Sequence, residues 1–205
     1  MTKYMWPTYA DILSVDHEVV NQGRSGSGNE LIFYKILKDF KENKLADADL
    51  IIVQWSGENR FDYLDRDGKW IGDGNILLPK NKDIFKSIKK WYNEDYEKEK
   101  TQNYHIAVTH LLSSLDAKVT FLAFPHISAD NIFLNNLWQK YRGNYQFKNT
   151  DWNIDEHPTV MQHLSIAQKI LARYNLGVSD LTLQKCNNCH NSILQDQQFT
   201  FVSLL

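Results

Sequence analysis

The stretch Asp49-Leu-Ile-Ile-Val-Gln-Trp55 decides the fold of this chain. Its apolar residues follow one another without a break, whereas a strand with one face in water alternates apolar and polar side chains. An unbroken run of this kind is typical of a parallel strand covered on both faces. Lys118-Val-Thr-Phe-Leu-Ala-Phe124 repeats the pattern, and we expect Pro125 to end it because proline cannot donate to a sheet ladder.

In the segments before and after these two strands, apolar residues recur with the spacing of a helix. One helix is predicted to begin at Asn29, which can cap it, because Ile32, Ile36 and Phe40 then share one face. The helices predicted from such spacing are 6–14, 29–40, 81–97, 98–115, 130–142 and 159–174. Apolar runs predict a strand at 17–21 and a strand-like segment at 199–205, and polar stretches predict loops at 22–28, 56–74 and 151–158. Within 56–74, Asp67-Gly68 and Asp73-Gly74 predict turns. Alternating strands and helices predict an α/β sandwich with a mainly parallel sheet.

Length and charge narrow the classes of function. The 205 residues suit one domain, expected over 1–175, with 81–115 as a helical insertion or cover and 176–205 as a C-terminal tail. The formal net charge of -2 provides no electrostatic reason to bind nucleic acid or an anionic membrane. No apolar run reaches the roughly 18 residues that a membrane span needs. The first residues lack the apolar segment of a signal peptide, so we expect a cytoplasmic protein.

Two polar clusters follow predicted strands, where the sites of open α/β sheets collect. The first, Asn21 to Asn29, contains Gly23, Gly26 and Gly28, which allow backbone N–H groups to turn toward a ligand. The second, Trp55-Ser-Gly-Glu-Asn-Arg60, includes an asparagine that can donate to a developing oxyanion. Each cluster can equally be a plain polar turn.

A third cluster, Asp155-Glu-His157-Pro158, precedes the last predicted helix. A carboxylate beside a histidine holds the imidazole in one tautomer and stabilises its charged form. The imidazole can then act as a general base near neutral pH. His-Pro at this place also serves as an ordinary helix entry.

Together the three clusters resemble the SGNH (GDSL) hydrolase superfamily over roughly residues 6–174. The residues that also resemble a bacterial and phage subgroup are Trp6-Pro7, Gly-Ser-Gly-Asn29-Glu, Val-Gln-Trp55-Ser and Arg60. The resemblance implies a three-layer α/β/α sandwich with a flavodoxin-like sheet. It also implies ester hydrolysis, with O-acyl groups on carbohydrates as one class of substrate, and neither a cofactor nor a metal.

The resemblance assigns a role to each matching residue. His157 is implied as the base and Asp155 as the residue that orients it. Gly26 and Asn59 are implied as the oxyanion donors. The residues expected to contact a small-molecule or carbohydrate ester are Ser56, Arg60 and Asn29.

The chain departs from the family at its start. The sequence contains no Gly-Asp-Ser block, which carries the nucleophilic serine and ends the family's central first strand. We expect the native protein to begin upstream of Met1; alternatively the flanking strands pair directly, or Phe199–Leu205 fills the gap. Two spacings also differ: Asp155-x-His157 replaces Asp-x-x-His, and Asn59-Arg60 replaces Asn-Asp, so that Arg60 can instead bind a carboxylate or phosphate.

Two alternatives stand beside the hydrolase. One is a binding module that keeps the cleft of the family but has no chemistry. The other lies in the tail, where Cys186-Asn-Asn-Cys189-His190 matches the haem-attachment pattern and offers three ligands of a zinc site. The simpler interpretation of the tail is a chance pair of thiols.

Overall fold

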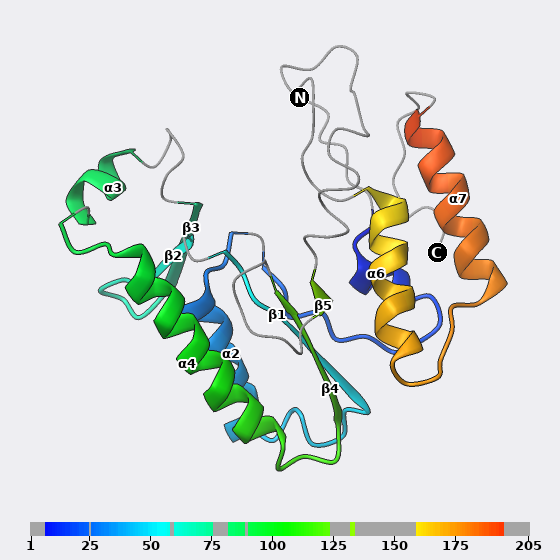
Figure 1. The fold of residues 1–205 in the computed structure, drawn as a ribbon, viewed down its shortest axis with the longest axis horizontal. Coiled ribbons are helices and arrows are strands. Elements are labelled where there is room, and N and C mark those ends of the chain that lie inside the picture. The colour runs from blue at the N-terminus through cyan, green and yellow to red at the C-terminus, as the bar shows by residue number, and fades with distance from the viewer. Residues whose placement is uncertain are drawn as a thin grey trace. The chain divides into compact units, whose positions relative to one another are not determined.

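The computed structural model describes residues 7–24, 26–57, 60–75, 82–88, 90–123, 132–133 and 159–194 (Figure 1). The chain divides into two compact units. The sheet unit is Gly23–Phe133, and the helical unit combines Met1–Gln22 with Leu134–Leu205.

A parallel sheet forms the centre of the sheet unit. Strand β1 (Leu50–Gln54) pairs in parallel with β4 (Lys118–Ala123), with Leu50 opposite Lys118 and Gln54 opposite Leu122. Strand β4 pairs in parallel with β5 (Ile132–Phe133), so the order is β1-β4-β5. The predicted α/β class with a parallel sheet is therefore confirmed.

Two helices, α2 (Asn29–Lys41) and α4 (Glu94–Leu112), lie together on one side of this sheet (Figure 1). Val53 and Trp55 pack with Val108 and Leu112 in a buried core. Burying a large apolar side chain stabilises a fold by about 1.5–3 kcal/mol, so these contacts hold the helices on the sheet. Leu122, whose side chain alternates with those that face this core, is also fully buried. Strand β4 therefore has buried side chains on the face away from this core as well, whereas β1 is buried chiefly on the core face and its Gln54, on the other face, is exposed.

An antiparallel hairpin occupies much of the segment predicted to be a loop at 56–74. It consists of β2 (Arg60–Leu64) and β3 (Trp70–Asn75). The predicted turn at Asp67-Gly68 is confirmed, because Asp65 accepts hydrogen bonds from the N–H groups of Asp67 and Lys69. The predicted turn at Asp73-Gly74 is wrong, because these residues lie inside β3. A strand interrupted by glycines shows no clear alternation, so its sequence resembled a loop.

Three other predictions need correction. Residues 17–21 form no strand, and the side chain of Val20 is 78% exposed, so this short apolar run does not provide the buried face that a strand of the sheet would have. Of the helix predicted at 130–142, the structure describes residues 132–133. These residues form strand β5, so the prediction is wrong there. The boundary expected near 97 lies earlier, between α3 (Lys82–Ile88) and α4, because Asn93 caps α4 by accepting from the N–H of Tyr96.

Three helices make up the described part of the helical unit: α1 (Tyr9–Leu13), α6 (Val160–Ala172) and α7 (Asp180–Leu194). The helices predicted at 6–14 and 159–174 are confirmed within these bounds, and Thr8 and Thr159 each begin one with a capping box. Helix α7 lies in the segment expected to be a tail, and it packs on α6. The expected boundary between a domain over 1–175 and a C-terminal tail over 176–205 stays a prediction. No helix in the described ranges has both the length and the apolar character needed to cross a membrane.

Candidate functional site

Two of the predicted polar clusters meet at the C-terminal end of β1. The N–H of Ser56 donates to Oδ1 of Asn29 over 2.7 Å, and Nδ2 of Asn29 donates to the carbonyl of Ser56 over 3.0 Å. The second amide hydrogen of Asn29 points to Oγ1 of Thr101 on α4, at 3.0 Å. Asn29 is buried, so this network joins the first turn of α2, the end of β1 and α4.

Asn29 was predicted to cap α2, and this prediction is wrong. The N-cap is Gly28, which has no side chain to offer, and the amide of Asn29 is engaged with Ser56 instead. The capping group comes from the hairpin. Oδ1 of Asp62 accepts from the N–H of Gly28 over 2.8 Å, and Oδ2 accepts from the N–H of Leu31 over 3.0 Å. A carboxylate suits this place because the N-terminus of a helix carries partial positive charge.

Sequence reasoning missed Asp62. Its partners lie 31 and 34 residues earlier in the chain, so no local capping motif contains it. One signal was present: Asp62 is a single carboxylate between two aromatic residues, Phe61 and Tyr63. A carboxylate on a mostly apolar strand is rarely buried without partners, so this pattern could have marked it.

The glycines of the first cluster are required by close packing. A β-carbon on Gly28 would lie 2.7 Å from Oδ2 of Asp62 and 2.8 Å from the carbonyl oxygen of Arg60. A β-carbon on Gly72 of β3 would lie 3.1 Å from Oδ1 of Asp62 and 3.3 Å from the carbonyl oxygen of Gly26. Gly26 itself has a φ of 84°, in the left-handed region that glycine adopts most readily. The predicted turn therefore lies directly against the hairpin.

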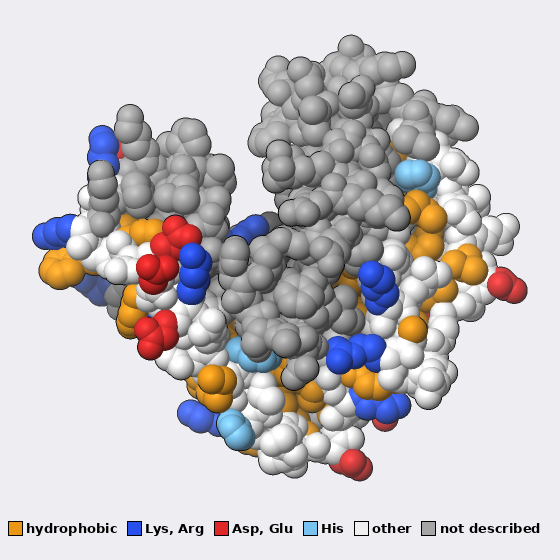
Figure 2. All heavy atoms as spheres, in the orientation of Figure 1, with side chains coloured by type: hydrophobic (Ala, Val, Ile, Leu, Met, Phe, Trp, Pro, Cys, Tyr) orange, Lys and Arg blue, Asp and Glu red, His pale blue; other side chains and the backbone are white. Residues whose placement is uncertain are grey.

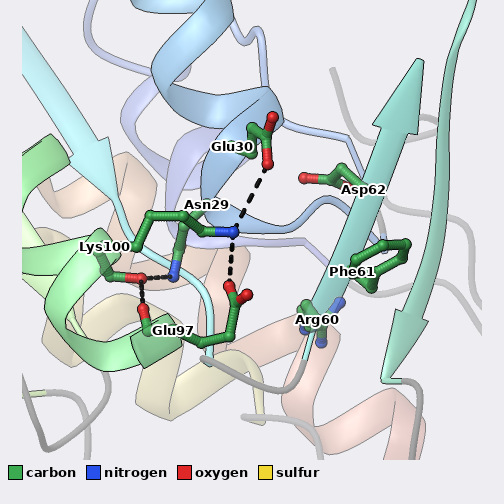
Figure 3. Close-up of a pocket in the computed structure, with 8 residues that line it drawn as sticks. Asn29, Glu30, Arg60, Phe61, Asp62, Glu97 and Lys100 are labelled. Atoms are coloured by element: carbon green, nitrogen blue, oxygen red, sulfur yellow. Dashed lines mark hydrogen bonds and ion pairs between the residues drawn. The ribbon is translucent and has the colours of Figure 1, made fainter. Parts of the chain in front are cut away.

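A small polar pocket opens between α2, β2 and α4 (Figure 3). The residues that line it are Asn29, Glu30, Arg60, Phe61, Asp62, Glu97, Lys100 and Thr101. Nζ of Lys100 lies 2.6 Å from Glu97 and 3.6 Å from Glu30. Partial burial acts to lower the pKa of Lys100, but the hydrogen bond and charge of Glu97, together with Glu30, hold that pKa above its ordinary value. Lys100 is thus charged and already compensated.

Arg60 differs from Lys100. Within the described ranges no carboxylate lies within ion-pairing distance of its guanidinium, and no dashed line reaches it in Figure 3. Arg60 is half-buried at the wall of the pocket. Its N–H groups can therefore receive a carboxylate, a phosphate or the oxygen of a neutral ligand.

The surface around the pocket carries charges of both signs. Figure 2 shows acidic and basic side chains next to one another over the N-terminal half of α4. Ion pairs join Lys98 to Glu94 and Lys100 to Glu97 in this region. Such a mixed surface fits the small net charge of the whole sequence.

The structure describes four of the predicted site residues. Asn29 and Ser56 are in direct contact, and Arg60 lines the same pocket as Asn29. Gly26 lies on the turn that packs against the hairpin. The remaining three predicted residues, Asn59, Asp155 and His157, lie outside the described residues.

The cysteines lie on α7, where Cys186 and Cys189 are one turn apart and both buried. Burial raises the pKa of Cys186 to about 11 and, with the added charge of Cys186, that of Cys189 to about 12. Burial also lowers the pKa of His190. Zinc binds thiolates, so protonated buried thiols favour a packing role. In the ranges that the structure describes, no three His, Cys, Asp or Glu side chains are grouped so as to hold a metal.

Comparison of the chain with protein-family models, with curated proteins and with solved structures found no match.

Proposed function

We propose that the chain is an SGNH-type ester hydrolase whose site lies at the C-terminal end of β1, in a three-layer α/β/α sandwich with a flavodoxin-like sheet. One observation carries this proposal: the Asn29–Ser56 contact joins the first and second polar clusters at the edge of a parallel sheet. Ligands of open α/β sheets bind at this edge. The left-handed turn at Gly26 beside this contact suits a backbone N–H donor.

The proposed reaction follows the Ser-His-Asp scheme. A serine attacks the acyl carbonyl while His157, oriented by Asp155, removes the proton of its hydroxyl. His157 then gives this proton to the leaving alcohol as the ester C–O bond breaks. A water molecule, deprotonated by His157, finally releases the acyl group from the serine as a carboxylic acid, and the serine regains its proton. The N–H of Gly26 and the side chain of Asn59 stabilise the oxyanion. The substrate is a small ester, with an O-acyl group on a carbohydrate as the favoured class, and the reaction uses no cofactor. The proposed setting is the cytoplasm, without nucleic-acid or membrane partners.

A binding module is the second candidate, and the contacts of the pocket favour it. Both amide hydrogens of Asn29 are engaged within the fold. Among the described serines, none donates its hydroxyl to an imidazole nitrogen. Arg60, by contrast, forms no ion pair with the carboxylates of the described residues, so its guanidinium can donate to a ligand. The described part of the site thus presents groups for binding and no pair of nucleophile and base.

Hydrolysis of p-nitrophenyl acetate and of an acetylated xylo-oligosaccharide by the native protein tests the first candidate. We expect turnover above the buffer rate, and a fluorophosphonate probe should attach to one serine that mass spectrometry identifies. His157→Ala should abolish both turnover and labelling, because the base activates the nucleophile. His110→Ala provides the matched control, since this histidine is exposed near the end of α4. If the native protein shows no turnover and no labelled serine, the hydrolase is ruled out and the binding module remains.

A further inference from the structure

We infer that Asp62 is a positioning residue: from the hairpin, its carboxylate holds the turn that carries Gly26 and Asn29. The effect expected on catalysis rests on the proposed function, but the effect on the turn does not. The hairpin β2–β3 would then help to position the residues of the site.

The contacts of Asp62 are those of a helix cap supplied by another element. Each carboxylate oxygen accepts from one N–H group at the start of α2, at 2.8 Å from Gly28 and 3.0 Å from Leu31. Only 5% of Asp62 is exposed. Gly28, the N-cap residue, has no side chain with which to cap the helix itself. Loss of the carboxylate would leave two backbone donors without their partner.

The surroundings leave this carboxylate little freedom. Gly28 and Gly72 lie on its two sides, and a β-carbon on either would approach within 2.7 Å or 3.1 Å of it, respectively. The pairing of β2 with β3 also shifts in register between Arg60 and Asp62. A bulge of this kind re-aims side chains, so it can direct Asp62 toward α2 (Figure 3).

The anchored turn connects Asp62 with the predicted site. Gly28 lies between Gly26 and Asn29 in the chain, so a cap on its N–H restrains the backbone on both sides. Asn29 in turn holds Ser56. Arg60 lies two residues before Asp62 on the same strand, so the attachment of the hairpin also keeps the guanidinium at the pocket.

Amide NMR of the full chain tests the inference directly. In Asp62→Ala, we expect the N–H signals of Gly26, Gly28, Leu31 and Ser56 to shift, with loss of hydrogen-exchange protection at Gly28 and Leu31. Formate should restore them, because it is a carboxylate that fits the space left by the side chain, whereas chloride should not. Asp65→Ala is the matched control: this carboxylate also accepts two N–H groups of the hairpin, but both lie in its own turn.

If Asp62→Ala does not fold, Asp62→Asn decides instead, since it keeps one acceptor oxygen and almost the same shape. It should shift the signals of Gly26 and Ser56 while Asp65→Asn leaves them in place. Unchanged Gly26 and Ser56 signals in the folded Asp62 variant would overturn the inference, and so would the absence of any formate effect in a folded Asp62→Ala.

Turnover separates this inference from the proposed function. In a native protein that hydrolyses p-nitrophenyl acetate, Asp62→Asn should lower kcat more than it changes KM, because a displaced Gly26 N–H would weaken stabilisation of the transition state alone. Asp65→Asn should change neither. A protein without turnover would contradict the proposed function, while the amide signals would still decide the role of Asp62.

Discussion

At the residue scale, Gly28 has no room for a side chain. A β-carbon added at this position would lie 2.8 Å from the backbone carbonyl oxygen of Arg60. A backbone atom cannot rotate away as a side chain can. We expect Gly28→Ala to lower the free energy of unfolding by about 1–3 kcal/mol, the usual cost of overpacking. Urea denaturation followed by far-UV circular dichroism measures it. Gly177→Ala is the control, because nothing lies within 4 Å of its β-carbon position; a cost equal to that of Gly28→Ala would show that crowding is not the cause.

Asn29 is a second test at this scale. Asn29→Ala removes the partner of the Ser56 N–H and of Oγ1 of Thr101 in a buried place. Leaving buried polar groups without partners costs about 1–3 kcal/mol, and we expect a loss of stability in that range. Asn103→Ala, on the exposed side of α4, should stay within about 0.5 kcal/mol of the original protein. Thermal or urea unfolding compares the two variants, and equal stabilities would argue against a structural role for Asn29.

At the element scale, Asp16 holds the start of α7. Its carboxylate accepts from the N–H and hydroxyl of Ser179 and from the hydroxyl of Thr182. Partial desolvation acts to raise the pKa of Asp16, but these hydrogen bonds, chiefly from Ser179, hold that pKa below its usual value of 3.8. Because the folded pKa is the lower one, the contribution of Asp16 to stability exists above the unfolded pKa. It is lost as the pH falls through the folded pKa.

Asp16→Asn should therefore destabilise the protein at neutral pH and make little difference once the pH is below the folded pKa of Asp16. The effect should be small because Asp16 is largely exposed. Urea midpoints of both proteins between about pH 2 and pH 7 measure it. Glu18→Gln, in the same loop and also exposed, should leave the pH dependence unchanged. A difference between Asp16→Asn and the original protein that grows toward low pH would contradict the predicted sign.

The packing of α7 on α6 leads to a separate prediction about the reactivity of the two cysteine thiols. Cys186 and Cys189 are buried and have pKa values raised to about 11 and about 12. In the folded protein at about pH 8 we expect both to react slowly with iodoacetamide, since the thiolate is the reactive form. In denaturant both should react quickly. Mass spectrometry counts the alkylated thiols, and rapid labelling of the folded protein would mean that α7 does not bury them.

At the scale of the whole molecule, the net charge bears on whether the protein binds nucleic acid. With a net charge of -2 and with acidic and basic side chains interspersed over α4 (Figure 2), we expect no binding to duplex DNA even at about 50 mM salt. A gel-shift titration against a basic control protein measures it. A shift that weakens as salt is added would show a basic surface that the net charge conceals.

Local pattern was sufficient for some of the regular elements of this protein. The unbroken apolar runs at Leu50–Gln54 and Lys118–Ala123 correctly predicted two parallel strands, because runs of this kind are typical of a parallel sheet. Helical spacing determined α2 and α6, although the cap of α2 was assigned to the wrong residue. The pattern failed at Val20, where a short apolar run is exposed and forms no strand. It also failed in the glycine-rich β3, which pairs with the neighbouring strand.

The sequence by itself thus determined the α/β class, the two main strands and the polar character of the two loops that meet beside β1. Only the tertiary structure decided which groups join these loops. Asp62 reaches the start of α2 from a hairpin 31 and 34 residues away in the chain, and Asn29 turns to Ser56 instead of capping its own helix. The physical reason is that strand and helix periodicity are local properties. Partners for buried N–H groups and carboxylates, by contrast, are found wherever the folded chain brings them within hydrogen-bonding distance.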